Sequence, residues 1–259
     1  MGFSYADWAG VFYPPGTKAG DYLAHYARYF DAVELDTTFH GTPPPERVRR
    51  WADATPDDFR FCAKAPKTVT HEGLARAEAP MSEFLDALRA FGPKLGVILL
   101  QFPPSLTVEA LSPLAALLAT LPPDVRFAAE FRHPSWESPG QVERVFEVLA
   151  EHRCAWAGAD YAQDPWDLHA TTDFLYVRWI GHHHTFARTD REQVDVTERL
   201  TWWAKRIADA AKQRPVDAVW GFFNNDFAGY SVGTCNRFKA IVGQPVRRPT
   251  PQDRSELFA

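Results

Sequence analysis

The chain has 259 residues, which suits one large α/β barrel or two small domains, and its hydrophobic content of 46% can fill a large core. Its net charge of −5 gives no general attraction to nucleic acid, so binding of that kind would need a local basic patch. No apolar run approaches the ~20 residues of a membrane span, no signal peptide is recognised, and three distant cysteines form no metal-ligand spacing, so we expect a reduced cytoplasmic protein.

Apolar segments of strand length alternate with helical patterns along the chain. The first helix is predicted over residues 18–30, where apolar side chains fall at helical spacing. Seven strands are predicted at 32–36, 60–64, 95–102, 126–131, 155–160, 174–181 and 218–224. Helices are predicted from Pro44–Pro45 onward and over 107–121, 141–152, 196–212 and 233–242. A long loop and a helix are predicted over 66–91, and residues 163–170 have weak helical character.

Strands that alternate with helices indicate a parallel sheet. No linker, repeat or low-complexity stretch divides the chain, so we predict a single TIM (β/α)8 barrel over residues 1–243. Residues 244–259 are rich in Pro, Arg and Gln and are predicted to form a polar tail on the surface.

Each predicted strand ends in a polar residue that is able to do chemistry. In strand order, these residues are Glu34 and Asp36, Lys64, Gln101, Glu130 and Arg132, Asp160, Arg178, and Asn224 with Asn225. In a barrel of parallel strands these ends gather at one mouth, where barrel enzymes keep their active sites.

Strand periodicity predicts which side chains face the barrel interior. Residues two apart share a face, so Glu34 is expected beside Asp36, and Arg178 on the face of Tyr176 and His182. Because a buried charge is costly unless it is paired, we expect salt bridges within one inward set. That set is Glu34, Lys64, Glu130, Arg132, Asp160 and Arg178.

The carboxylates allow two kinds of chemistry. Glu34, Glu130 and Asp160 are the candidate catalytic residues, as general acid and base. Carboxylates and imidazoles on separate strands could instead hold Zn²⁺ or Mn²⁺, although no tight metal motif is present. The candidate metal ligands are Glu34, Asp36, Glu130, Asp160, His133 and His182. A third reading is that the acids only form ion pairs that shape the mouth.

The basic residues indicate an anionic ligand. Lys64, Arg132 and Arg178 could hold phosphate or carboxylate oxygens. Loop tryptophans such as Trp136 and Trp166 could stack on a ring of the ligand. The remaining candidate substrate contacts are His71, Gln101, Asn224 and Asn225.

Short motifs in order along nearly the whole chain resemble the family called domain of unknown function 72. They are residues 4–8 with 12–14, 33–34 with 38–39, 64–66 with 70–71, 101–104, 130–133 with 135–136, 176–178, and 223–225. The resemblance implies a TIM barrel with a shared pocket and no established reaction.

The chain departs from that family's pattern at Asp36, His40 and Ile180, where similar proteins carry Asn, Tyr and His. The resemblance also implies a strand before Gly2. We therefore expect a truncated or degenerate first strand, or a start codon placed too late.

The hypothesis that we favour is a hydrolase-like enzyme acting on a small or polymeric phosphate-bearing substrate, nucleic acid included. Its mechanism would use acid/base or metal-assisted chemistry, and a divalent metal is not required. One alternative is a glycosidase with two carboxylates, whose separation would be diagnostic. The other is a ligand-binding or regulatory protein without a reaction. No membrane partner is expected, and the sequence identifies no partner protein.

Overall fold

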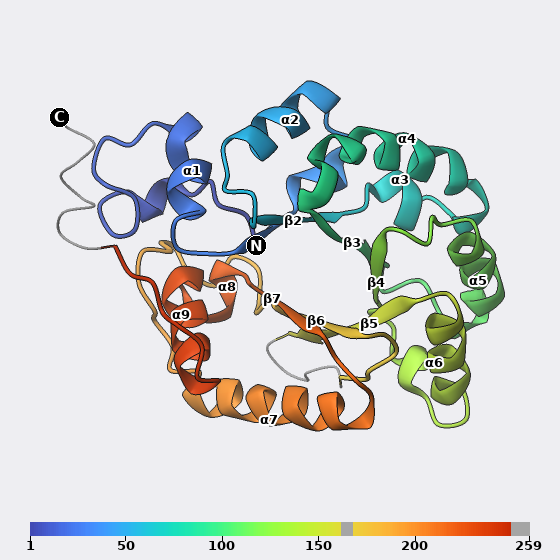
Figure 1. Cartoon of the computed structure of the whole chain (residues 1–259). Coiled ribbons are helices and arrows are strands. Elements are labelled where there is room, and N and C mark those ends of the chain that lie inside the picture. The colour runs from blue at the N-terminus through green and yellow to red at the C-terminus, as the bar shows by residue number, and fades with distance from the viewer. Residues whose placement is uncertain (162–167, 250–259) are drawn as a thin grey trace.

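The computed structural model describes residues 1–161 and 168–249. Seven parallel strands form one sheet in sequence order, and Figure 1 shows them curving into a nearly closed barrel inside a ring of helices. The strands are β1 Ala32–Leu35, β2 Arg60–Lys64, β3 Leu95–Gln101, β4 Arg126–Glu130, β5 Cys154–Asp160, β6 Phe174–Trp179 and β7 Ala218–Phe223. The predicted TIM-like α/β fold is confirmed, and each predicted strand matches an observed one to within two residues at either end.

The helices are less regular than the sequence pattern predicted. They are α1 Tyr22–Tyr26, α2 Pro45–Asp53, α3 Lys67–Thr70, α4 Glu78–Leu88, α5 Leu111–Ala119, α6 Val142–Glu151, α7 Thr197–Gln213, α8 Asn225–Ala228 and α9 Ser231–Ile241. α1 is much shorter than the predicted helix, the predicted 66–91 segment divides into α3 and α4, and α8 was not predicted. Most of the weak helix at 163–170, with Trp166, lies outside the described residues.

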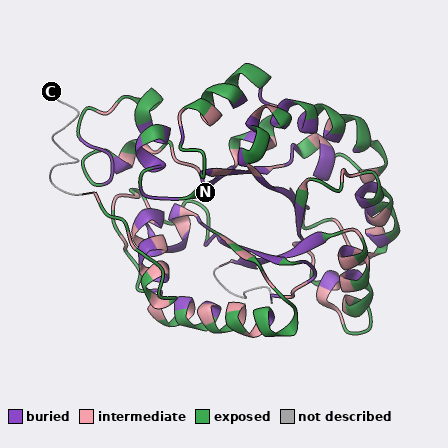
Figure 2. Ribbon diagram, viewed as in Figure 1, coloured by how far each residue is buried: buried purple, intermediate pink, exposed green. Residues whose placement is uncertain are grey.

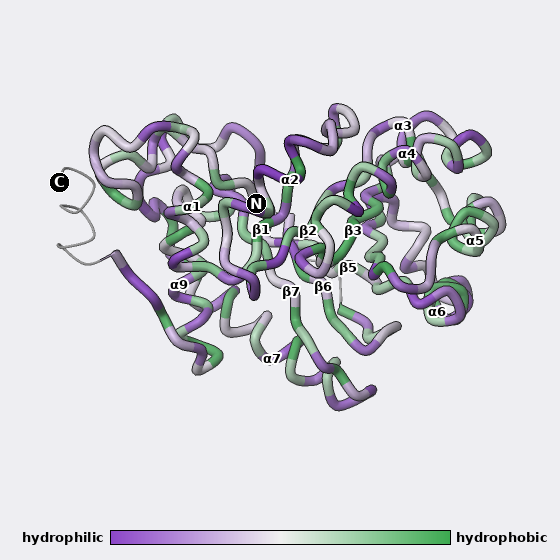
Figure 3. The backbone as a smooth tube through the Cα atoms, turned by 45° about the horizontal axis from the view of Figure 1, so that its top comes forward, coloured by the Kyte–Doolittle hydropathy of each residue, from purple (hydrophilic) through white to green (hydrophobic). Residues whose placement is uncertain are grey.

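Strands such as β3 and β5 are buried on both faces, as Figure 2 shows in purple. The two faces of the sheet differ in side-chain size. Much of the interior of the barrel holds small and medium side chains, because seven strands leave little room at the axis, and Phe174, Tyr176 and Phe222 are its large rings. This interior set includes Cys62, Val97, Leu99, Ala128, Ala155, Ala157 and Ala159. Large rings such as Phe61, Trp156 and Trp179 point outward and pack under the helices. Figure 3 shows mostly hydrophobic strands inside helices of mixed hydropathy.

The barrel has a seam between β1 and β7, which are not paired with each other. The first two residues close its upper end: the Gly2 amide donates to the Glu34 carbonyl at 2.9 Å, and the Met1 amino group donates to the Phe223 carbonyl at 2.5 Å. This is the degenerate first strand that the sequence predicted.

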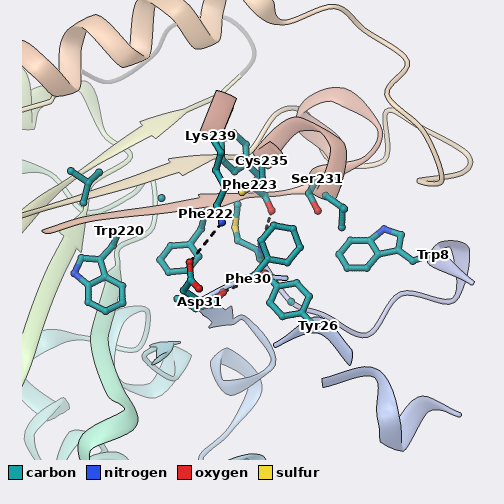
Figure 4. A pocket seen from close by; sticks show the side chains of 16 residues that line it. Trp8, Tyr26, Phe30, Asp31, Trp220, Phe222, Phe223, Ser231, Cys235 and Lys239 are labelled. Atoms are coloured by element: carbon teal, nitrogen blue, oxygen red, sulfur yellow. Dashed lines mark hydrogen bonds and ion pairs between the residues drawn. The ribbon is translucent and has the colours of Figure 1, made fainter. Parts of the chain in front are cut away.

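Below these two residues the seam widens into a cavity of about 190 Å³. Figure 4 shows its aromatic lining, including Tyr26 and Phe30 on one side and Phe222 on the other. Val219 of β7 is 46% exposed, as expected for an edge that lacks a neighbouring strand.

Cys62, Cys154 and Cys235 are free thiols. No helix in the described part of the chain is long and apolar enough to cross a membrane. Residues 244–249 continue beyond α9, and Arg247 reaches Asp31 at 2.9 Å, while 250–259 lie outside the described residues. The predicted division into barrel and tail stays a prediction.

Candidate active site

Arg178 lies at the centre of a charged cluster at the carboxyl ends of the strands. β6 places it inside the barrel, where its side chain is only 4% exposed. Its Nε and Nη2 donate to the two carboxylate oxygens of Glu34 from β1, at 2.9 and 2.7 Å. Its Nη1 donates to Glu130 from β4 at 2.6 Å. One guanidinium therefore joins two fully buried carboxylates from strands far apart in the sheet.

Two tyrosines complete the hydrogen bonding of these carboxylates. Tyr176 donates to Glu34 at 2.6 Å, and Tyr161 donates to Glu130 at 2.5 Å. Burial alone would raise the pKa of Glu130, but Arg178 and Arg132 outweigh it and lower this pKa to about 2. The pKa of Glu34 is likewise lowered, because Arg178 outweighs the effect of burial. Both glutamates are thus held as anions that are fully bonded by protein groups.

Asp36 is the carboxylate of this cluster that meets solvent. It follows β1, its side chain is 38% exposed, and its Oδ1 lies 3.3 Å from Nη2 of Arg178. Loss of hydration, together with the nearby charge of Glu34, raises the pKa of Asp36 to about 7. Asp36 can therefore hold or release a proton near neutral pH, as a general acid must.

Lys64 ends β2 on the same rim. Its ammonium lies 3.8 Å from the centre of the Phe39 ring and, among the described residues, forms no salt bridge. The Thr38 hydroxyl lies 2.7 Å from the Lys64 carbonyl and so ties the loop that carries Phe39 to this strand end. Burial and the neighbouring Arg178 lower the pKa of Lys64 to about 8. At neutral pH Lys64 is still a cation, and its charge is not neutralised by direct contact.

Arg132 adds a second accessible cation. Its Nε donates to Glu130 at 3.0 Å, and its guanidinium carbon lies 4.8 Å from the centre of the Tyr161 ring. Within the described ranges its two terminal nitrogens make no hydrogen bond. A partly exposed guanidinium held by its Nε presents those two nitrogens to a ligand.

His71 stands near both cations. Thr70 Oγ1 lies 2.8 Å from its Nδ1, and the Phe39 ring centre lies 4.9 Å from the imidazole centre. Partial burial and the positive charges of Lys64 and Arg132 lower the pKa of His71. The imidazole is therefore neutral at pH 7, and the contact with Thr70 fixes the orientation of the ring.

The structure does not place Asp160 in this mouth, so its predicted inward orientation is wrong. Asp160 points outward, where its carboxylate accepts from Arg199 Nε at 2.7 Å and from Trp203 Nε1 at 2.6 Å. The physical reason is the register of β5, whose alanines fill the narrow interior while the larger side chains alternate outward. In the sequence, the small residues at 155, 157 and 159 indicate which face of β5 points inward. The same alternation places Tyr161 on the inner face and Asp160 on the outer face.

Three further candidates hold the loops together and do not line the mouth. Trp136 is fully buried, stacks on Phe131 at 4.0 Å and donates to the Leu106 carbonyl, so it cannot stack on a ligand as predicted. His133 caps the turn that follows it, because its Nδ1 accepts from the Ser135 amide at 3.1 Å. His182 lies on an exposed loop, against the expectation that it faces the interior.

The polar residues at the ends of β3 and β7 satisfy local backbone groups. Gln101 is buried beside Glu130 in the strand register and donates to the Phe102 carbonyl at 2.6 Å. Asn224 accepts from the Asp226 amide at 3.1 Å, and Asn225 accepts from the Ser231 amide at 2.9 Å. The two asparagines thus fix α8 and the start of α9, a local role that the sequence left open.

Within residues 1–161 and 168–249 no three His, Cys, Asp or Glu side chains are close enough together to hold a metal ion. Arg178 stands between Glu34 and Glu130, in the place where a bridging cation would be needed. The mouth is thus suited to bind an anion at Lys64 and Arg132 and to move a proton at Asp36.

Comparison with known proteins identifies a family. The family model described as "Protein of unknown function DUF72" matches residues 1–256. The curated relative UPF0759 protein YecE of Escherichia coli K12 is 37% identical over 124 residues, which are 48% of this chain and 46% of the relative. UPF0759 protein YunF of Bacillus subtilis is 32% identical over 148 residues, 53% of this chain and 51% of that protein. The matched segments thus span about half the length of these relatives.

Two solved structures share the fold. A DUF72 family protein from Thermotoga maritima is 27% identical, with a TM-score of 0.75 and coverage of 94% of this chain and 97% of that chain. A DUF72 family protein from Enterococcus faecalis is 21% identical, with a TM-score of 0.76 and coverage of 96% of both chains.

Proposed function

The chain belongs to the DUF72 family, whose solved members share its barrel, and from the chemistry of its mouth we propose that it is an enzyme that hydrolyses a phosphate-bearing anionic substrate. The observation that carries the proposal is Lys64, a cation at the rim that forms no salt bridge among the described residues.

Lys64 and Arg132 supply the anion site. Glu34 and Glu130 are already bonded to Arg178, so they leave the charge of Lys64 without a direct counterion. An ammonium and the free edge of a guanidinium suit the oxygens of a phosphate group. The positive charge also stabilises the additional negative charge that develops on those oxygens as water attacks.

Asp36 and His71 supply proton transfer. Neutral His71 accepts a proton from the attacking water, a phosphorus–oxygen bond forms, and the bond to the leaving oxygen breaks as Asp36 donates its proton there. A pKa of about 7 makes Asp36 an acid that is partly protonated at neutral pH. The family resemblance implies Asn at position 36, so this acid is a feature of this chain.

The two alternatives are less well supported by the same contacts. A glycosidase needs two carboxylates that are free to act on a sugar, and Glu34 and Glu130 are both held by Arg178. A ligand-binding or regulatory protein without a reaction would be favoured by a pocket whose charges are all neutralised in fixed pairs, and Lys64 has no such partner among the described residues.

The test is titration with inorganic phosphate at pH 7, joined to an assay with p-nitrophenyl phosphate. Lys64→Met should weaken phosphate binding by roughly 10- to 150-fold, the loss of one charged hydrogen bond of about 1.5–3 kcal/mol. Lys67→Met is the matched control, because Lys67 lies three residues on and its ammonium is 3.8 Å from Glu72. Phosphate binding that is unchanged in both Lys64→Met and Arg132→Met would overturn the proposal.

A further inference from the structure

A groove lies between α1 and α2, which Figure 1 shows as neighbours on the rim of the barrel, and Leu35 and Asp36 at the end of β1 belong to its lining. We call it the α1–α2 groove. Its volume is about 720 Å³. Its lining includes Phe3, Leu23, Arg47, Arg50 and Trp51. Asp36 lines this groove and also contacts Arg178, so the groove and the site described above share this residue.

One face of α2 forms a cationic wall of this groove. Arg47, Arg50, Trp51 and Ala54 follow the spacing of residues that share one side of a helix. Both arginines are exposed, and within the described parts of the chain neither guanidinium has a hydrogen bond or ion pair. Two cations that no carboxylate neutralises thus border one groove.

The rest of the lining is mainly apolar. Leu23 and Leu35 are buried beneath it, and Phe3, Tyr5 and Trp51 are half-buried rings along it. Apolar surface open to water favours an apolar occupant, and flat rings favour a flat one. The lining therefore combines apolar and aromatic contacts with two fixed positive charges.

We propose that the α1–α2 groove binds the non-reacting part of the substrate, an apolar ring system that ends in a second anionic group. This inference rests on the proposed function, in which the reacting phosphate lies on Lys64 and Arg132. The ring system would lie along Trp51 and Phe3, and the distal anion would bind the guanidinium groups of Arg47 and Arg50. The substrate class is a phosphate ester that carries an aromatic spacer and a distal carboxylate or phosphate.

Such an arrangement gives the remote arginines a role in reaction as well as in affinity. Binding energy from a distant part of a substrate can hold the reacting group in place, so truncated substrates lose rate as well as binding. An arginine fork also discriminates a charged terminus from a neutral one of the same shape.

The experiment compares three probes: inorganic phosphate, biphenyl-4-yl phosphate and 4′-carboxybiphenyl-4-yl phosphate. The wild-type protein should bind 4′-carboxybiphenyl-4-yl phosphate about tenfold more tightly than biphenyl-4-yl phosphate, because the carboxylate adds one charged contact. Arg47→Gln with Arg50→Gln should abolish that gain and leave inorganic phosphate unchanged. Arg49→Gln is the control, because Arg49 lies on the same helix and does not line the groove. A biphenyl bisphosphate in place of the carboxylate probe shows which anionic terminus is preferred.

The outcomes separate the two proposals. If inorganic phosphate binds and the carboxylate brings no gain, or the gain survives in the double variant, the groove proposal is wrong and the anion site stands. If neither the wild-type protein nor the variants bind inorganic phosphate, the proposed function fails, and the groove proposal fails with it.

Discussion

Two buried arginine–carboxylate clusters stand at strand ends of this barrel, one on each face of the sheet. The inner cluster joins Arg178 to Glu34 and Glu130. The outer cluster joins Arg199 of α7 to Asp160 of β5. In both clusters the carboxylates are fully buried. The side chain of Arg178 is 4% exposed, whereas that of Arg199 is 30% exposed.

The difference lies in what surrounds each pair. Among the described residues the outer pair is one cation and one anion, and the indole of Trp203 adds a hydrogen bond that fastens α7 to the sheet. The inner cluster continues toward solvent through Arg132, Asp36 and Lys64. Arg132 and Asp36 each contact one member of the cluster, and Lys64 contacts the Phe39 ring. A buried ion pair alone therefore does not indicate a site. Partly paired charges at its edge, here Lys64 and Asp36 with their displaced pKa values, favour a functional site.

The largest expected effect comes from removing the inner guanidinium. Arg178→Met leaves two buried carboxylates without their counterion, and removal of one partner from such a cluster costs about 3–5 kcal/mol. We expect a loss of that size in the free energy of unfolding, measured by urea denaturation at pH 7. A loss under 1 kcal/mol would mean that water or another cation replaces Arg178 easily.

The outer cluster should show a smaller effect that is confined to stability. Asp160→Ala leaves Arg199 and the Trp203 indole without this acceptor, and Arg199 is partly solvated already, so we expect a loss of about 1–3 kcal/mol. Phosphate affinity of the folded variant, measured by calorimetry, should equal that of the wild type. A fall in affinity as large as that of Lys64→Met would erase the functional distinction between the two clusters.

The last effect concerns pH, and solvent around the 38% exposed side chain of Asp36 reduces its size. The pKa of Asp36 is raised from 3.8 to about 7 in the folded state, so the folded protein binds more protons than the unfolded chain between these values. The contribution of Asp36 to stability is therefore complete below about pH 4 and is lost as pH rises through 7. Asp36→Asn should flatten this fall, measured as the urea midpoint between pH 4 and pH 8.

Asp58→Asn, at an exposed aspartate away from the mouth, is the control for the pH experiment. Parallel pH profiles for the wild type and Asp36→Asn would show that Asp36 titrates like an ordinary surface carboxylate.

Much of the fold follows from local sequence pattern. All seven strands were predicted from short apolar runs that are bounded by proline and glycine. These features act within a few residues, so a local pattern is enough to show them. The helices were predicted less well, as α1 and α3 show, because short helices depend on packing more than on propensity. The mouth was predicted from strand ends, and Glu34, Glu130, Arg132 and Arg178 do meet there.

The sequence by itself determined the order and parallel direction of the strands, and with them the end of the barrel at which the polar strand ends gather. Only the tertiary structure decided which face each of those residues takes and which partner it meets. The inward place of Arg178 and the outward place of Asp160 follow from how side chains of different size fill a narrow interior. The displaced pKa values of Lys64 and Asp36 follow from burial and from charges on other strands. Those are long-range properties, and no local pattern of residues encodes them.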